Sequence, residues 1–171
     1  MRRVKYFVAM SLDGFIAGPQ GEVDWLFMDQ DYGMTEFYSS IDTVLLGRKT
    51  YEFGVSHGAR SYPGVTNIVF SRTLRASEYP EVTVVTADAG ETIGGLRNQE
   101  GKDIWLVGGS QIFRAALRAG CVDDVIVAVH PMLLGDGIPL LPTPAEMTHL
   151  ELTDTTRCSS GLVTMSYSVK R

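Results

Sequence analysis

The chain has 171 residues, of which 44% are hydrophobic, and a formal net charge of −5 at pH 7. This length fits one domain over residues 1–171, and the acidic balance offers no basic face to nucleic acid or to an anionic membrane surface. Two cysteines without CxxC spacing suggest no disulfide framework, which favours a reducing, cytoplasmic location. The apolar runs are too short for a transmembrane helix, so we expect a protein whose partner is a small molecule.

Strand and helix patterns alternate along most of the chain. Short apolar or β-branched runs predict strands over residues 5–12, 43–47, 66–71, 82–87, 103–109 and 123–133. Helices are expected over residues 35–41 with Thr35 as a possible cap, from residue 48, from residue 89 and over residues 111–120. The final stretch, residues 150–171, alternates polar and apolar residues around a Ser-Ser-Gly turn and predicts a hairpin. This order predicts an α/β fold with a central, mostly parallel sheet and an antiparallel C-terminal hairpin.

Glycines lie at two junctions where a strand leads into a helix, VLLG-RKTYE before Arg48 and IWLVGG-SQIF before Ser110. Ligands of α/β sheets bind at the carboxyl ends of strands, and a helix N-terminus offers free N–H groups to a phosphate. A glycine pair also occurs where a strand turns sharply into a helix without any ligand, and both interpretations stay open. Neither junction has the spacing of a P-loop or of a Rossmann fingerprint.

A third candidate is SRTL, which follows the strand TNIVF. The hydroxyl of Ser71 and the guanidinium of Arg72 suit a phosphate monoester, although a solvated surface loop is the simpler interpretation of SRTL taken alone. Together with Arg48, Lys49 and Thr50, they supply anion-binding groups on an otherwise acidic chain.

Five blocks in order, SLDGFIAG, VLLGRKTYE, IVFSRTL, WLVGGSQIF and LLGDGIPLLP, resemble the dihydrofolate reductase fold. More closely, they resemble its stand-alone bacterial relatives that are grouped with the reductase domain of riboflavin biosynthesis. The resemblance covers nearly the whole chain. It implies a three-layer α/β fold, NADPH as the cofactor and a homodimer.

The resemblance also implies which residues contact NADPH. The residues implied beside the phosphates are Gly47, Arg48, Lys49 and Thr50. Those implied at the pyrophosphate are Gly108 and Gly109, followed by Ser110, Gln111 and Ile112 in the first turn of the helix above it. For the ribose 2′-phosphate they are Ser71 and Arg72, and for the nicotinamide Ala9, Ile16 and Ala17. Dihydrofolate reductases have a cis peptide between the paired glycines, so we expect one between Gly108 and Gly109.

The sequence departs from the dihydrofolate reductase pattern in the pterin pocket. Asp29, Asp31 and Glu36 are the acidic residues near the first helix, and spacing favours Asp31, with Glu36 as a second candidate catalytic residue. Acidic residues on the wet face of a helix are the other interpretation. Asp13, Asp24 and Asp136 are further carboxyl groups that could supply a proton.

Phe113 replaces the usual tyrosine near the nicotinamide, which argues against folate as the substrate. The zinc deaminase signature of the full-length riboflavin enzyme is missing, no metal site is expected, and the three histidines are interpreted as surface or structural residues. Three hypotheses follow. They are an NADPH-dependent oxidoreductase acting on a small heteroaromatic or carbonyl compound, a nucleotide-binding protein without turnover, and, ranked last, another kind of enzyme.

Overall fold

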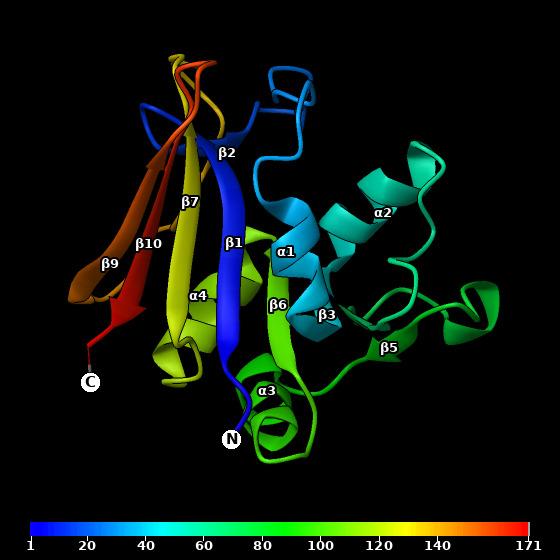
Figure 1. Ribbon diagram of the computed structural model, residues 1–171. Coiled ribbons are helices and arrows are strands. Elements are labelled where there is room, and N and C mark those ends of the chain that lie inside the picture. The colour runs from blue at the N-terminus through cyan, green and yellow to red at the C-terminus, as the bar shows by residue number, and fades with distance from the viewer. Residues whose placement is uncertain (171) are drawn as a thin grey trace.

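The computed structural model describes residues 1–170, which form one eight-stranded sheet with helices on both faces (Figure 1). The strand order is β5-β4-β3-β6-β1-β7-β10-β9. The bounds are β1 Val4–Ser11, β3 Ile41–Gly47, β4 Thr66–Phe70, β5 Thr83–Val85, β6 Asp103–Gly108, β7 Asp124–His130, β9 Leu150–Arg157 and β10 Val163–Val169. Neighbouring strands from β5 to β7 are parallel, and β10 is antiparallel to both β7 and β9. The predicted parallel sheet with a C-terminal antiparallel pair is therefore confirmed.

The helices form the two outer layers of the fold. The helices α1 (Met34–Ser39) and α2 (Arg48–Ser56) lie on one face of the sheet, and α3 (Ala89–Arg97) and α4 (Ser110–Arg118) lie on the other (Figure 1). A short 3₁₀ turn, η1 (Ala76–Glu78), precedes β5, and a small second sheet pairs β2 (Phe15–Ala17) with β8 (Ile138–Pro139). None of the helices within residues 1–170 is long and apolar enough to cross a membrane.

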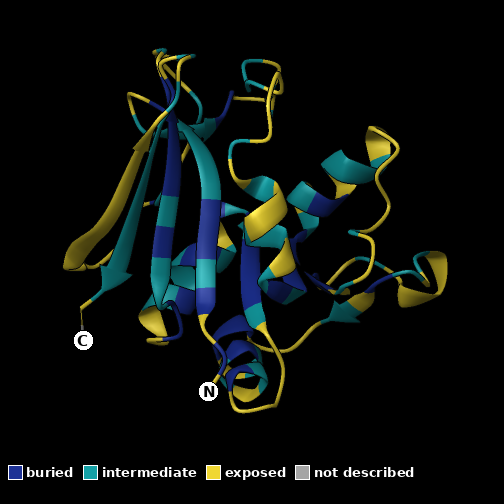
Figure 2. Cartoon of the chain, viewed as in Figure 1, coloured by how far each residue is buried: buried dark blue, intermediate teal, exposed yellow. Residues whose placement is uncertain are grey.

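Each face of the sheet has its own hydrophobic core. Leu45 and Leu106 are fully buried under α3 and α4, and Val44 and Trp105, one residue away on the same strands, are buried on the face of α1 and α2. Burial on both faces explains why β3 and β6 are almost continuously apolar. The edge strand β9 is exposed along its whole length (Figure 2).

Most element boundaries differ from expectation by one or two residues, and Ile41, expected in the first helix, begins β3. The first helix begins at Met34 with Gly33 at the N-cap position, so Thr35 lies inside the first turn. The strand expected over residues 123–133 ends at His130, because Pro131 has no N–H to continue the ladder. The strand expected over residues 82–87 keeps only its centre, Thr83–Val85, at the far edge of the sheet.

Candidate functional site

The two glycine junctions meet at the carboxyl edge of the sheet. Strands β3 and β6 are parallel neighbours, and Leu46 pairs with Gly108. A Cβ atom on Gly47 would lie 3.2 Å from the backbone N of Gly109 and 3.6 Å from the carbonyl O of Gly108. A Cβ at 3.2 Å would be an unusually tight contact, so glycine suits this close approach of the two strand ends. The peptide between Gly108 and Gly109 is cis, as the resemblance implied.

Both helices that start here lack a capping side chain. Helix α2 has Gly47 and helix α4 has Gly109 at the N-cap position, neither with a side-chain hydrogen bond to the first turn. In α3, by contrast, the Asp88 carboxylate accepts a hydrogen bond from the backbone N of Glu91 at 3.0 Å. The free N–H groups and the positive ends of two helix dipoles therefore share one glycine-lined edge, an arrangement that fits a pyrophosphate.

Thr50 is the residue of α2 that lies closest to the glycine pair. Its Oγ1 is 3.4 Å from the position of a Cβ on Gly109 and 3.5 Å from that of a Cβ on Gly108. Arg48 instead pairs with Glu52 on the same helix at 2.8 Å, and Lys49 is exposed. Thr50 also borders a cavity of about 280 Å³ between α2 and β4. The structure brings Thr50 to the glycines, whereas the two cations point into solvent or toward their own helix.

Ser71 and Arg72 follow β4, which is the next parallel strand beside β3. Ser71 is buried, and its Oγ accepts hydrogen bonds from the backbone N of Leu74 at 2.9 Å and of Thr73 at 3.2 Å. The hydroxyl thus shapes the turn that carries Arg72. Arg72 is exposed and has no ion pair or hydrogen bond among residues 1–170, so its guanidinium is available to a ligand.

The expected nicotinamide contacts lie on β1 and β2. Ala9 pairs in register with Ala128 of β7. Ile16 and Ala17 lie in β2. A Cβ on Gly137 would collide with the carbonyl O of Ala17, so the close approach of these two segments of the chain requires glycine.

Asp13 fastens the β1–β2 turn to the loop after β7. Its carboxylate accepts hydrogen bonds from Ser11 Oγ at 2.6 Å and from the backbone N atoms of Leu134 at 3.0 Å and Gly135 at 2.7 Å. The Ser11 bond contributes most, followed among the favourable contacts by the Gly135 and Leu134 amides, and together they lower the pKa of Asp13 to about 2. A carboxyl group held ionised in this way is an anchor rather than a proton donor.

Asp13→Asn should loosen this anchor, because an amide cannot accept three hydrogen bonds as an anion does. The lowered pKa means that the wild-type anchor is complete above about pH 4 and is lost as the pH falls through about 2. We expect the protection factors of the Leu134 and Gly135 amides, which are corrected for the intrinsic pH dependence of exchange, to fall on acidification in the wild type. In the variant they should be low and nearly independent of pH. Equal protection in both proteins would contradict the anchor.

The two candidate catalytic acids lie on the outside of the molecule. Asp31 is exposed and accepts hydrogen bonds from Thr35 Oγ1 at 2.7 Å and Thr35 N at 3.0 Å, which caps α1. These bonds, the side-chain one first, hold the pKa of Asp31 below its usual value, whereas a proton donor at neutral pH needs a raised pKa. Glu36 is also exposed. The structure thus gives Asp31 a structural task, and a catalytic role for either acid stays a prediction.

Phe113 is buried and stacks on Tyr6, with ring centroids 3.8 Å apart.

Of the three histidines, His57 and His149 are exposed. His130 is 2% exposed and holds the backbone of Phe27, a contact that sequence reasoning did not anticipate. The one feature of the sequence that could have indicated this contact is a polar residue at the end of the apolar run VIVAV. Residues 1–170 contain no group of three side chains that could hold a metal ion.

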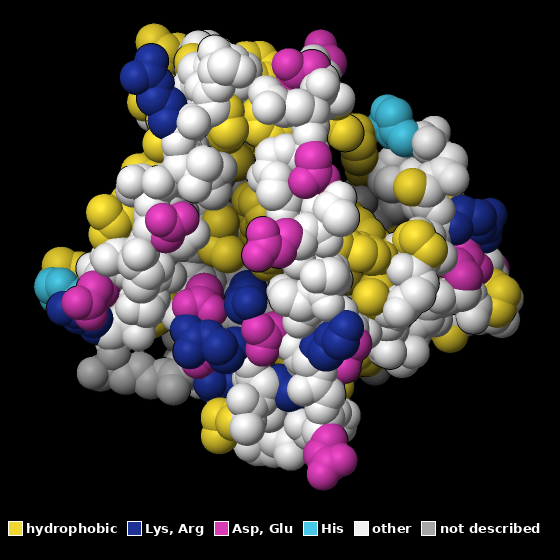
Figure 3. Space-filling view, in the orientation of Figure 1, with side chains coloured by type: hydrophobic (Ala, Val, Ile, Leu, Met, Phe, Trp, Pro, Cys, Tyr) yellow, Lys and Arg dark blue, Asp and Glu magenta, His cyan; other side chains and the backbone are white. Residues whose placement is uncertain are grey.

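A hollow lies on the face of the sheet that carries α1. Figure 3 shows hydrophobic side chains at its bottom, between the arm formed by β9 and β10 and the helix α1. Phe7 of β1 contacts Phe37 of α1 edge to face, with centroids 4.8 Å apart, so Phe7 and Ala9 point to this face. The hollow therefore adjoins the expected nicotinamide contact at Ala9.

Residues 2–164 match the sequence model of the RibD C-terminal domain. The chain belongs to this family. Among relatives of this RibD C-terminal domain protein, the protein YyaP of Bacillus subtilis (strain 168) is 33% identical over 97% of the chain and 94% of its own length.

Two solved structures share the fold of this RibD C-terminal domain protein. One, described as a riboflavin biosynthesis protein of Shewanella sp. PV-4, has a TM-score of 0.84 and 24% identity, covering 99% of both chains. The other is dihydrofolate reductase from Enterococcus faecalis complexed with NADP(H), with a TM-score of 0.73 and 18% identity over 99% of this chain and 97% of that one. Both likenesses concern the fold.

Proposed function

We propose that the protein is an NADPH-dependent reductase that transfers hydride to a small heteroaromatic or carbonyl compound. The observation that carries the proposal is the glycine-lined edge where the uncapped N-termini of α2 and α4 meet. Membership of the RibD C-terminal domain family and the NADP(H) bound by the E. faecalis enzyme of the same fold support it.

In this proposal the chain's own residues bind and orient. The backbone N–H groups after Gly47 and Gly109 hold the pyrophosphate, and Arg72 contacts the ribose 2′-phosphate. Ala9, Ile16 and Ala17 place the nicotinamide against the hollow beside α1. The bound cofactor supplies the hydride. The homodimer implied by the resemblance stays a prediction, which light scattering of the purified protein checks.

Turnover is tested by mixing the protein with NADPH and a panel of oxidised heteroaromatic and carbonyl compounds while the absorbance of NADPH is followed. Oxidation of NADPH that depends on both the protein and a panel compound supports the reductase. A second candidate is a nucleotide-binding protein without turnover, which the exposed positions of Asp31 and Glu36 favour. It predicts NADPH binding with no oxidation of the cofactor by any compound.

Arg72→Ala separates NADPH from NADH. A hydrogen bond to a charged group contributes about 1.5–3 kcal/mol, so the variant should bind NADPH about tenfold to a hundredfold more weakly. NADH lacks the 2′-phosphate, and its affinity should hardly change. Arg75→Ala is the matched control, because Arg75 is exposed on the same loop and pairs with Glu78 at 3.6 Å. Equal losses for both cofactors would remove the 2′-phosphate contact from Arg72.

A further inference from the structure

His130 ends β7 with both ring nitrogens engaged. Its Nδ1 lies 3.0 Å from the carbonyl O of Ala128, and its Nε2 accepts a hydrogen bond from the backbone N of Phe27 at 3.2 Å. A carbonyl oxygen only accepts, so Nδ1 carries the proton and the imidazole is neutral. The side chain is almost completely buried.

Two aromatic rings pack on this imidazole. Trp25 meets it edge to face with centroids 5.2 Å apart, and Phe27 lies 5.0 Å away at 59°. Both belong to residues 22–33, the second part of the segment that links β2 to α1, which we call the strap. His130 therefore fixes the middle of the strap to the carboxyl end of β7.

The far end of the strap has a second attachment. The Tyr32 hydroxyl lies 2.6 Å from Asp29 Oδ1 and 3.1 Å from Ser160 Oγ, in the turn between β9 and β10. Tyr32 has a φ of 52°, in the left-handed region that bulky residues rarely adopt, so its surroundings must hold it there. Between the two attachments the strap is exposed, with Met28 at 85%.

The strap borders the proposed reductase site. Ala128, whose carbonyl binds His130, pairs in register with Ala9, and His130 pairs with Ser11 on the same strand. Since side chains two residues apart on a strand share a face, His130 and Ala9 line the same side of the sheet. The strap follows Ile16 and Ala17 in the chain and leads into α1.

We propose that His130 is a positioning residue of this reductase site, which in its neutral form holds the strap over the hollow beside Ala9 and on protonation releases it. The proposal rests on the proposed function for its catalytic meaning. The contacts supply the mechanism, because a protonated Nε2 would present an N–H to the N–H of Phe27 and turn an attraction into a clash of two donors.

Burial of the imidazole also favours its neutral form. It lowers the pKa of His130, and the bond to Ala128 only partly offsets this. The sign follows from the lowered pKa: the attached strap is favoured above about pH 6.5, the ordinary value, and loses support as the pH falls below it.

No charged or titratable neighbour competes for the imidazole. The groups on the elements around it are Glu22, Asp24, Asp29, Asp31 and Tyr32 on the strap, Asp13 on the β1–β2 turn, Asp136 on the loop after β7, and Arg157 and Cys158 at the hairpin. Within residues 1–170, none of them forms a hydrogen bond or ion pair with His130. The imidazole is therefore the group whose charge decides whether the Phe27 contact persists.

The test is amide hydrogen exchange of the cofactor-free protein, expressed as protection factors at about pH 7.5 and about pH 5.5. We expect the protection of Phe27 in the wild type to fall by up to about tenfold at the lower pH, the most that protonation of a group with an ordinary pKa of about 6.5 can supply over this interval, while Ile104 and Leu106 in the buried strand β6 stay protected. His130→Gln can accept from Phe27 and donate to Ala128 without titrating, so Phe27 should stay protected at both pH values. His130→Phe keeps a ring without an acceptor and should leave Phe27 unprotected at both.

A fall in Phe27 protection with pH in His130→Gln equal to that of the wild type would overturn the proposal, as would a wild-type strap that is insensitive to pH. If His130→Phe does not fold, the comparison of Phe27 protection between the wild type and His130→Gln is sufficient for the test. The link to the site is tested by NADPH affinity. It should fall more at about pH 5.5 in the wild type than in His130→Gln, because protonation of the cofactor's 2′-phosphate weakens binding equally in both proteins. A strap that opens with no such difference would overturn the positioning role. Failure of the wild type to bind NADPH at any pH would instead count against the proposed function.

Discussion

Gly109→Val is expected to abolish detectable binding of both NADPH and NADH, a loss of at least about a hundredfold or ~2.7 kcal/mol. The added side chain would project from the N-cap of α4, where Gly109 lies against Thr50 at the junction with Gly47. A branched side chain there fills the space that a pyrophosphate needs beside the first N–H groups of the helix. Cofactor fluorescence and thermal shift both report the loss.

The backbone of Gly109 permits the substitution, since its φ of −93° and ψ of −170° are extended and open to any residue. Gly95→Val is the matched control. Gly95 lies in α3 and a Cβ on it would meet nothing within 4 Å. The control should bind both cofactors like the wild type. Unchanged binding by folded Gly109→Val would show that the glycine pair is only a turn.

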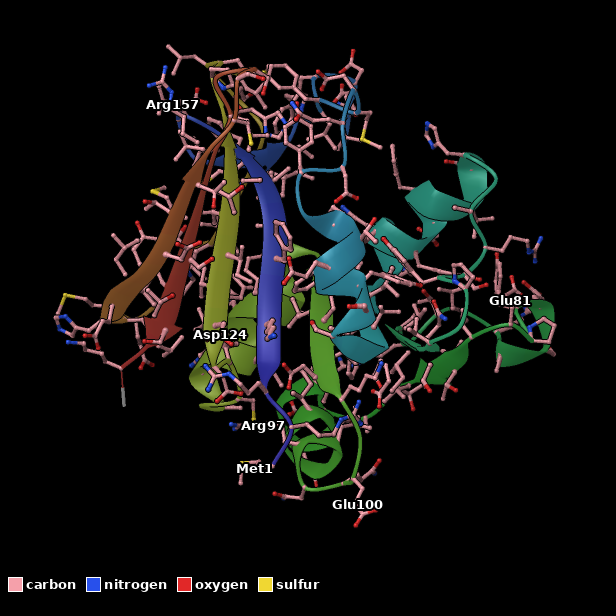
Figure 4. The ribbon with its side chains drawn as sticks, viewed as in Figure 1. Met1, Glu81, Arg97, Glu100, Asp124 and Arg157 are labelled. Carbon is pink, nitrogen blue, oxygen red and sulfur yellow. The ribbon has the colours of Figure 1, made fainter. Side chains whose placement is uncertain are left out.

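Asp123→Ala is expected to lower the free energy of unfolding by about 3–5 kcal/mol, the cost of leaving a buried charge without its partner. Asp123 accepts hydrogen bonds from Arg97 at 2.7 Å and from the backbone N of Val4 at 2.8 Å. The side chains of Asp123 and Arg97 are only 11% and 10% exposed. Figure 4 shows Arg97 at the amino-terminal end of the sheet, opposite the edge with the glycine junctions.

Denaturant unfolding measures this loss. Arg97 already has a buried Nε without a partner, and the variant would leave it only the carbonyl O of Gly120, at 3.3 Å. Glu151→Ala is the control, because the pair of Glu151 with Lys170 is 3.5 Å long and more than half exposed on both sides. It should change stability by less than about 1 kcal/mol. Similar small losses in both variants would mean that solvent reaches the Arg97 pair.

The fold was largely predictable because its inner strands are apolar runs, and because glycine ends β3 and β6 and proline follows β7. β3 and β6 are buried on both faces, which makes their sequences unambiguous. The C-terminal hairpin was readable from its alternation around Ser159-Ser160-Gly161. The short length of β5 was not predictable from the sequence. An edge strand pairs with one neighbour only, so extending its β-branched run adds few hydrogen bonds.

The sequence predicted the parts of the site that the backbone forms. It did not predict which side chains pair with one another. The meeting of Gly47 with Gly108 and Gly109 follows from glycine at the ends of neighbouring strands. The spacing does not decide whether Arg48 pairs with Glu52 four residues on or binds a ligand, nor whether Asp31 caps a helix through Thr35 or acts on a substrate, because the same residue types suit both. His130 is structural, as one of the two interpretations had it, but its contact with Phe27 was not predictable because the partner is a backbone N–H, which any residue could supply.

Titration of the purified protein with NADPH and NADH, followed by cofactor fluorescence and thermal shift, tests the central claim most directly. The glycine-lined edge with two uncapped helix N-termini predicts saturable binding with a preference for NADPH and a raised unfolding temperature at excess cofactor. Absence of binding by either cofactor to the folded protein would contradict a nucleotide site, and with it the reductase.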